Sequence, residues 1–298
     1  MKRGLFTVSY AGLWGQARLT LEKTVEKAAG FGFDGVLLMA KRPHLSPIDY
    51  SEEELGRLRA LLDEKGIEAI GLAAYNDFLA PGPSEVPFDE MQLAYIETCC
   101  RISSALGGKL VRIFTGYERA GESALLQWEQ VVRLLREAGQ RAARYGITLA
   151  VQNHHDLAVD TEAMRSLLED IGHPSVRAGF DAWSPFLRGE DLYESAKLMA
   201  PHTVLSIAAN YRRYKRYRYK PGLVNYEQVE PDMVRAASMS EGEIDYVSFL
   251  QGLSDGGYEG PLVYEMCSPL EGGGGEDNLD AKAKDFLSCC SRIIEETG

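Results

Sequence analysis

Residues 149–156 read Leu149-Ala150-Val151-Gln152-Asn153-His154-His155-Asp156, an apolar run that ends abruptly in a polar cluster with two adjacent imidazoles. A helical pattern begins soon afterwards, at Asp160. A short, almost wholly apolar run followed by a helix is typical of a parallel strand that is covered on both faces. We therefore predict a strand over residues 147–152, with polar side chains at its C-terminal end.

The same alternation continues through the whole chain. Strands are predicted at residues 5–10, 35–40, 67–75, 109–114, 147–152, 176–180, 204–209 and 261–265. Helical patterns follow them at residues 21–31, 51–65, 91–106, 124–145, 160–171, 191–199, 246–253 and 279–295. Eight βα units predict the α/β class and a single (β/α)8 TIM barrel. No change of composition marks a boundary, so we expect residues 1–298 to form one domain.

Two segments interrupt the alternation. Residues 76–90 are rich in Pro, Gly and Asp and are predicted as a loop. The segment from Tyr211 to Lys220 is basic and aromatic and starts a long excursion before the next helix. We expect it to form a lid over the barrel mouth or an interface with another subunit, since Tyr and Arg are enriched at interfaces. A surface for single-stranded nucleic acid is the third alternative.

The overall composition excludes several classes of protein. Hydrophobic residues make up 45% and charged residues 26% of the 298 residues, as in ordinary globular proteins. The net charge of −12 argues against a nucleic-acid partner, because non-specific binding to phosphates is mostly electrostatic. No apolar run is long enough to span a bilayer or to form a signal peptide. Five cysteines without metal-binding spacing indicate reduced thiols. We expect a cytoplasmic protein without a membrane partner and leave a homo-oligomer open.

Two carboxylates follow predicted strands of the barrel. In this fold, the C-terminal ends of the strands are where catalytic residues lie. Asp181 and Glu265 each come at the end of an apolar strand, where an unpaired carboxylate is costly to bury. They can pair with Arg112 or cap a helix. Alternatively they share a divalent cation, because hard cations take oxygen ligands.

Further polar and aromatic residues are candidates for substrate binding. Lys41 and His44 follow the second strand and suit contact with an anionic or polyol substrate, or simply a charged surface. Arg112 ends the fourth strand in an apolar frame and requires a carboxylate partner, either Asp181 or the substrate. Trp183 offers an apolar face for stacking on a sugar, with core packing as the alternative. Asn210, at the end of strand seven, completes this group.

Several motifs in this order resemble one family. The clearest are residues 242–246, Gly-Glu-Ile-Asp-Tyr, and residues 257–265, Gly-Tyr-Glu-Gly-Pro-Leu-Val-Tyr-Glu. Residues 24–35, 152–154 and 180–181 support them. Over nearly its whole length, the chain resembles the xylose isomerase-like TIM barrels, a superfamily of sugar phosphate isomerases and epimerases and endonuclease IV-like proteins. The motifs are specific for the superfamily and not for one activity.

The resemblance implies a metal site on four strands. The family's Glu, Asp, His and Glu ligands fall here on Gln152, Asp181, Ser206 (or a neighbour) and Glu265. Two ligands are kept and two are changed. We leave open whether a divalent cation such as Mn, Mg, Zn or Co binds Gln152, Asp181 and Glu265. An amide oxygen can coordinate a cation but cannot accept a proton at neutral pH, so Gln152 is a candidate ligand and not a base.

Proton transfer is therefore expected from other groups. Glu265 is the candidate base, unless it is only a ligand. His154 should face the same side as Gln152 if the strand continues, and histidine suits acid–base work near neutral pH. Its alternative role is a hydrogen bond to a substrate hydroxyl. His155 is expected to point the other way and to be structural. Arg235 occupies a position where the resemblance implies a substrate-binding Arg.

The resemblance, together with these residues, implies a sugar or keto-sugar isomerase or epimerase that removes a proton next to a carbonyl, with or without a divalent metal at the C-terminal mouth of the barrel. A dehydratase or other lyase acting on a sugar or polyol starts with the same step and is the second hypothesis. A non-catalytic sugar-binding barrel with a degraded metal site is the third.

Overall fold

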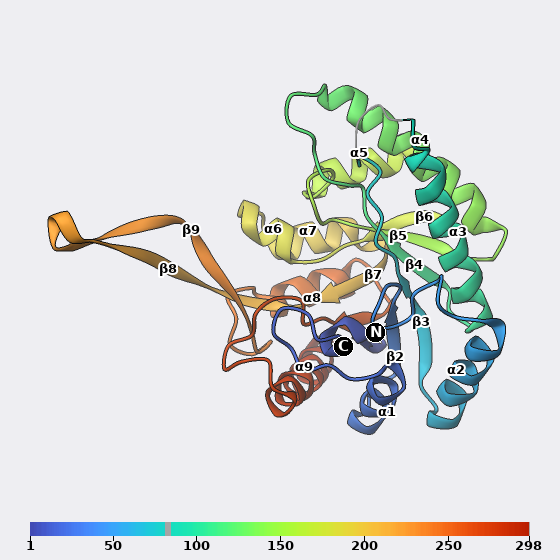
Figure 1. The fold of residues 1–298 in the computed structure, drawn as a ribbon, viewed down its shortest axis with the longest axis horizontal. Helices are drawn as coiled ribbons and strands as arrows, with labels where there is room; N and C mark the ends of the chain where they lie inside the picture. Colours follow the sequence, from blue (N-terminus) through green and yellow to red (C-terminus); the bar gives the residue numbers. More distant parts are fainter. Residues whose placement is uncertain (81–84, 298) are drawn as a thin grey trace.

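The computed structural model describes residues 1–80 and 85–297 and contains a closed barrel of parallel strands (Figure 1). In chain order its strands are β1 (Arg3–Phe6), β2 (Gly35–Met39), β3 (Glu68–Ala73), β4 (Leu110–Ile113), β5 (Thr148–Gln152), β6 (Val176–Gly179), β7 (Thr203–Ala208) and β10 (Leu262–Tyr264). Neighbours in sequence are neighbours in the sheet. The barrel closes where β1 pairs with β10, Arg3 lying opposite Leu262. The prediction of a (β/α)8 TIM barrel is confirmed.

Helices surround the barrel between successive strands (Figure 1). They are α1 (Leu21–Phe31), α2 (Glu52–Lys65), α3 (Phe88–Ala105), α4 (Ala124–Ala143), α5 (Thr161–Ile171), α6 (Trp183–Arg188), α7 (Leu192–Met199), α8 (Tyr246–Asp255) and α9 (Glu276–Thr297). Helix α2 shows how local sequence sets these limits, because Ser51 and Glu54 form a capping box and Gly66, at φ +64°, ends the helix. No helix in the described part of the chain is long and apolar enough to cross a membrane.

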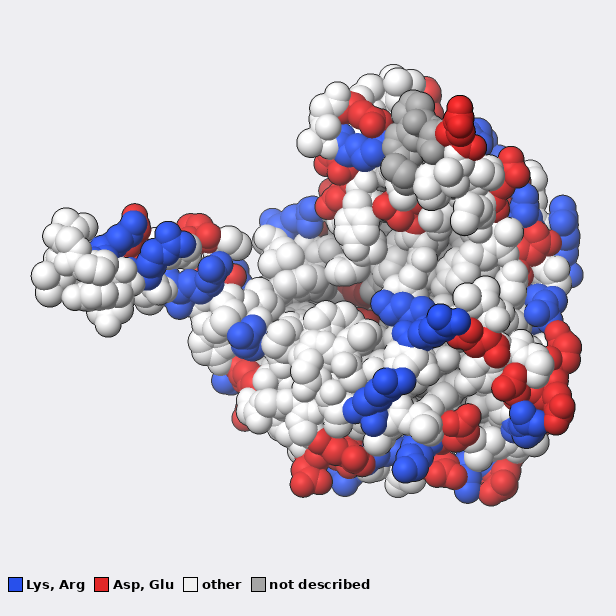
Figure 2. Space-filling view, viewed as in Figure 1, with Lys and Arg blue, Asp and Glu red and all other residues white. Residues whose placement is uncertain are grey.

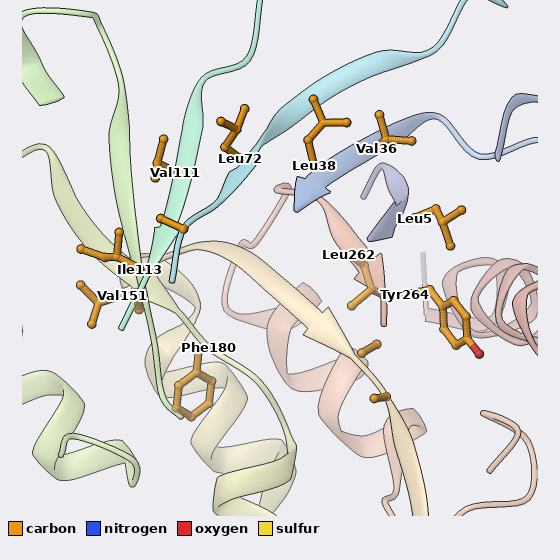
Figure 3. Packing of buried hydrophobic residues seen from close by; sticks show 14 of the residues in the cluster. Leu5, Val36, Leu38, Leu72, Val111, Ile113, Val151, Phe180, Leu262 and Tyr264 are labelled. Atoms are coloured by element: carbon orange, nitrogen blue, oxygen red, sulfur yellow. The ribbon is translucent and has the colours of Figure 1, made fainter. Parts of the chain in front are cut away.

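Side chains on alternate strand positions face two different cores. Leu37 and Met39 of β2 point into the barrel, with Leu205 and Ile207 of β7 in the same inner cluster. The intervening positions face the helices and belong to the larger cluster, part of which Figure 3 shows along neighbouring strands. Because the period of a strand is two, this alternation decides which polar residues at the strand ends can face the barrel interior.

The first strand is shorter than expected. A strand was predicted over residues 5–10, but β1 ends at Phe6 and Thr7–Tyr10 form a 3₁₀ turn. Thr7 Oγ1 accepts a hydrogen bond from the main-chain N of Met39 at 2.9 Å, and Ser9 Oγ accepts one from Met266 N at 2.9 Å. The whole turn is buried, so its apolar pattern is the same as that of a buried strand.

A long β-hairpin leaves the barrel after β7 (Figure 1). Strands β8 (Asn210–Lys220) and β9 (Asn225–Ala237) pair antiparallel in a separate two-stranded sheet, with a 3₁₀ turn at Pro221–Leu223 at the tip. We call residues 210–237 the arm. The basic and aromatic run is therefore a strand and not a loop. Of the loop predicted at 76–90, residues 88–90 belong to α3, and residues 81–84 lie outside the described chain.

Candidate active site

A cavity of about 430 Å³ lies at the C-terminal ends of the barrel strands. Most of its wall comes from residues within or just after β2 to β7 and β10. The polar and charged groups among them are Lys41, Asn76, Asp77, Gln92, Arg112, Gln152, His154, His155, Asp181 and Glu265. The volume falls within the range of small-molecule sites in enzymes.

Asp181 directly follows β6, and both of its carboxylate oxygens have donors. Oδ1 accepts a hydrogen bond from Ile207 N at 2.7 Å, and Oδ2 accepts one from Gln152 Nε2. Asn153 holds the main chain, since its side chain bonds to both Asp181 O (3.0 Å) and Asp181 N (2.7 Å). Burial raises the pKa of Asp181 to about 7, against the opposing effect of the Ile207 and Gln152 donors, and the nearby Glu265 charge also raises it.

Glu265 directly follows β10, and its main-chain N donates to Ala208 O at 3.0 Å. The carboxyl group lines the cavity. Burial raises the pKa of Glu265 above its usual value, while the positive charges of Arg112 and Lys41 oppose this shift. Two carboxyl groups that hold protons more strongly than normal therefore line the same cavity.

Arg112, on β4, is a buried cation that forms no carboxylate ion pair with any residue the structure describes. Its side chain is 1% exposed, and its guanidinium carbon lies 4.0 Å from the ring centroid of Phe114 and 4.9 Å from that of Tyr75. Nη1 donates to Ala74 O at 3.0 Å, but Nε has no hydrogen-bond partner. Of the two predicted partners of Arg112, Asp181 forms no ion pair with it in the described chain and accepts hydrogen bonds from Gln152 and Ile207 instead. A substrate remains the other predicted partner.

Lys41 supplies a second cation to the cavity. It follows β2, and its Nζ lies 3.7 Å above the ring centroid of Tyr75. Burial lowers the pKa of Lys41, and repulsion by Arg112 lowers it further, whereas Glu265 raises it. The aromatic ring thus supports the two cations on the side of the cavity formed by β2, β3 and β4.

Both adjacent histidines line the cavity. His155 was expected to point the other way, which is wrong because β5 ends at Gln152 and His155 adopts a left-handed φ of +66°. The ring of His155 lies 4.2 Å from that of Tyr117 and 4.8 Å from that of His154. Burial lowers the pKa of each histidine to about 4, with the Arg112 charge acting in the same direction. Both are therefore neutral at neutral pH.

Three of the predicted substrate-binding residues lie elsewhere. His44 is buried, and its Nε2 lies 3.3 Å from Leu19 O. The side chain of Asn210 bonds to the main chain of Tyr211, Met239 and Ile244. Arg235 is on the arm opposite Arg212, and its Nη1 donates to Val234 O at 3.1 Å. None of the three lines the cavity, whereas Lys41, Arg112 and Trp183 do.

Strand β7 contributes no metal-binding side chain to the cavity. Ser206, proposed as the changed ligand, has the opposite phase to Leu205 and Ile207, and its buried Oγ has no partner. The side chains that β7 and the next residue present to the cavity are Ile207 and Ala209. In the described ranges 1–80 and 85–297, no group of three or more His, Cys, Asp and Glu side chains could hold a metal ion. The donors present do not fit the four-ligand site that the resemblance implies.

Sequence reasoning missed most of the aromatic wall of the cavity. Lys41 lies over the ring of Tyr75 and Arg112 over that of Phe114. Trp183 packs against Tyr211 in a tilted arrangement with 4.4 Å between ring centroids. Tyr75 and Phe114 are the last residues of the predicted strands 67–75 and 109–114, so their positions were a usable signal. Tyr211 had no such signal, because the arm was predicted as irregular.

The fold agrees with a comparison to known families. The family model described as "Xylose isomerase-like TIM barrel" matches residues 25–287. The chain belongs to the xylose isomerase-like TIM barrel family. The resemblance inferred from the motifs is thereby confirmed at the level of the family.

The individual relatives described next are at most 28% identical to this chain. The 2-epi-5-epi-valiolone 7-phosphate 2-epimerase of Actinoplanes sp. is 28% identical over 170 residues, which cover 56% of this chain and 59% of that enzyme. The matched segment thus spans less than two thirds of that curated protein.

Solved structures of this family share the fold over nearly the full chain. D-Psicose 3-epimerase from Clostridium cellulolyticum, solved with D-tagatose, superposes with a TM-score of 0.74 at 17% identity, covering 99% of both chains. A probable 3-DHS dehydratase from Bacillus anthracis gives 0.71 at 17% identity, covering 96% of this chain and 99% of that one. At such identities the likeness establishes the fold alone.

Proposed function

We propose that this protein is an epimerase or isomerase of a keto-sugar or a closely related polyhydroxy ketone, and that the reaction takes place in the cavity at the barrel mouth. The observation that carries this proposal is that Asp181 and Glu265, two carboxyl groups with raised pKa values, line one cavity together with two cations that lack carboxylate ion pairs. The names of the relatives, a valiolone phosphate 2-epimerase and a psicose 3-epimerase, support a sugar substrate.

The carboxyl groups suit the two halves of a proton transfer. Ionised Glu265 takes the proton from the carbon next to the carbonyl, and the electron pair of that C–H bond forms an enediolate. Burial makes this carboxylate a stronger base than one in water. Asp181, with a pKa of about 7, is partly protonated at neutral pH and can return a proton to the same carbon or its neighbour. Return to the opposite face gives an epimer.

The cations suit the charge that this step creates. The enediolate oxygen becomes negative, and fixed positive charge in a water-poor site stabilises such an oxygen strongly. Since the donor set does not fit a metal, Arg112 and Lys41 supply this charge in the proposal. Arg112 is held between Phe114 and Tyr75, so little reorganisation accompanies the reaction. Neutral His154 then contacts a substrate hydroxyl by hydrogen bonding, which was its alternative role.

Substitution of Glu265 tests the proposal. We expect Glu265→Gln to lower turnover by about 10²- to 10⁴-fold, because an amide cannot accept the proton. The measurement is deuterium incorporation from D₂O into keto-sugars and sugar phosphates, followed by NMR, which detects the first proton transfer even without net conversion. Glu259→Gln, an exposed position six residues upstream, is the matched control and should retain full exchange.

Other outcomes would replace the proposal. If the wild type binds sugars without deuterium exchange, the barrel is a binding protein. A dehydratase would instead release water and form an unsaturated carbonyl compound, which absorbs in the ultraviolet. Full activity of Glu265→Gln would remove Glu265 from the mechanism.

A further inference from the structure

We call the part of the arm beyond Tyr214 and its strand partner Met233 the outer arm. Among the described residues, it forms no hydrogen bond or ion pair with the barrel that would explain its length. Near its base, Arg213 pairs with Glu243 at 2.8 Å and Tyr211 packs on Trp183. Beyond Tyr214 the polar contacts join the two strands of the arm to each other, as between Lys220 Nζ and the Glu227 carboxylate at 2.8 Å. Figure 1 shows this outer part extending away from the barrel and its helices.

The outer arm is also unusually apolar for an exposed segment. Of the sixteen large hydrophobic side chains that are exposed in the described chain, six lie between residues 214 and 226. Leu223 and Val224, at the tip, are 76% and 79% exposed, and Tyr226 is 67% exposed. Concentration of exposed apolar side chains in one short segment marks a contact surface.

The strand register gives the arm two different faces. Tyr217 and Tyr219 share one face, and Tyr226 lies opposite Tyr219 with 5.3 Å between the ring centroids. Arg216 and Arg218 project from the other face, because side chains alternate along a strand. One face is therefore aromatic and the other is basic.

A long two-stranded hairpin is not expected to be stable in water by itself. A two-stranded sheet is marginally stable at best in water, and both of its edges present unpaired main-chain groups. A surface that covers the exposed aromatic face would therefore stabilise the hairpin. Tyr and Arg, the residue types that dominate the arm, are those most enriched in protein–protein contacts.

Charge indicates which surface fits. Residues 210–237 carry seven Lys and Arg against three Asp and Glu, a net charge of +4, so the other 270 residues carry −16. Figure 2 shows the basic side chains of the arm standing apart from the mixed and acidic surface of the barrel. An acidic body and a basic arm on one chain are complementary between two copies. In a dimer with a two-fold axis, the arm of each copy can lie on the body of the other copy.

We propose that the arm is a self-association device, in which the arm of one copy lies on the barrel body of a second copy in a symmetric dimer. The aromatic face and the tip, Leu223 and Val224, form the buried contact. The positive charge of the arm attracts it to the acidic body and speeds association.

Sedimentation velocity of the full chain tests this proposal. We expect the wild type to be a dimer at micromolar concentration. The triple variant Leu223→Ser/Val224→Ser/Tyr226→Ser should weaken dimerisation at least 100-fold without loss of the barrel. The matched control, Leu125→Ser/Leu126→Ser/Val247→Ser, removes exposed apolar side chains from the body and should leave the dimer intact.

Charge reversal gives a second and independent measurement. Arg216→Glu/Arg218→Glu should slow association and weaken the dimer, whereas Lys23→Glu/Lys109→Glu, the same change of charge on exposed body positions, should not. Circular dichroism melts confirm that each variant is folded. A wild type that is monomeric at 100 μM, or a dimer that survives both arm variants, would overturn the proposal. Binding of the monomer to oligo(dT) through Arg216 and Arg218 would do the same in favour of a nucleic-acid surface.

Discussion

The side chain at position 152 and the charge of Asp181 are linked. A second carboxylate in contact with Asp181 would place two negative charges together, and either a proton or a cation would then have to relieve the repulsion. The amide of Gln152 donates to Asp181 instead. The amide therefore gives Asp181 a neutral hydrogen-bond donor, while β7 and the residue after it present only Ile207 and Ala209 to the same cavity.

Asp181 should make the stability of the protein fall as the pH rises. Its pKa is about 7 in the folded protein against an ordinary value of 3.8, so between these values the folded state keeps a proton that the unfolded chain has lost. The stabilising effect is complete below pH 4 and is lost as the pH rises through 7. We expect the free energy of unfolding of the wild type, relative to Asp181→Asn, to fall by at most about 4 kcal/mol over this range.

Urea denaturation of both proteins at pH 4.5, 6 and 7.5 measures this difference. The comparison with Asp181→Asn matters because His154 and His155, whose pKa values are lowered to about 4, act with the opposite sign and gain stabilising effect as the pH rises to 6.5. Both proteins contain these histidines, so their effect cancels. Parallel pH profiles for the two proteins would show that the Asp181 carboxyl is not held protonated.

The site residues that the sequence predicted well are those whose direction follows from the alternation of side chains along a strand. Asp181 and Glu265 each end an apolar strand, and both line the cavity. His155 was placed wrongly because the strand stops before it and the chain turns through a positive φ, which no pattern of apolar residues encodes. Ser206 was selected by analogy to a ligand position, but its phase along β7 turns it away from the interior.

At the scale of elements, Asn210 joins β7 to the arm. Its Nδ2 donates to Met239 O at 3.0 Å and Ile244 O at 3.2 Å, and its Oδ1 accepts from Tyr211 N and Ile244 N. All four contacts are to main-chain groups, one in the first residues of the arm and three in the segment that follows it. The side chain therefore fixes the direction in which the arm leaves the barrel.

Replacement of Asn210 should affect stability and not substrate binding. We expect Asn210→Ala to lower the free energy of unfolding by about 3 kcal/mol, because it leaves buried main-chain groups without partners. Urea denaturation measures this change, and KM of the folded protein should stay the same. Asn225→Ala, at an exposed arm position, serves as the control. A normal stability with a raised KM would restore the substrate-binding role first predicted for Asn210.

The elements that the sequence did not reveal lack a one-sided apolar pattern. The barrel strands and most helices were found because burial on known faces forces such a pattern. Strand β8 alternates Tyr with Arg and Lys and buries only Asn210 and Tyr211, so its residues resemble a polar loop. Helix α6 has six residues, too few to show helical periodicity. The strength of a prediction thus followed the amount of surface that each element buries.

For the molecule as a whole, the cavity should work without a metal. Arg112 and Lys41 provide its positive charge, and β7 offers no ligand. We expect dialysis against EDTA to change turnover by less than about twofold and the melting temperature not at all, with metal content measured by mass spectrometry before and after. Loss of turnover that Mn²⁺ or Mg²⁺ restores would show that the present donors bind a cation after all.

Closure of the barrel between β1 and β10 has a consequence for how the protein is made. A ribosome adds about 5–20 residues per second, so Arg3–Phe6 wait on the order of tens of seconds before Leu262–Tyr264 exist to pair with them. During that time the growing sheet has open edges on β1 and β7, while the arm, whose contacts are local, can already form. The strand that finally closes the sheet is directly followed by Glu265. The newly made chain therefore gains its complete cavity only in the same event that closes the open edges of the barrel sheet.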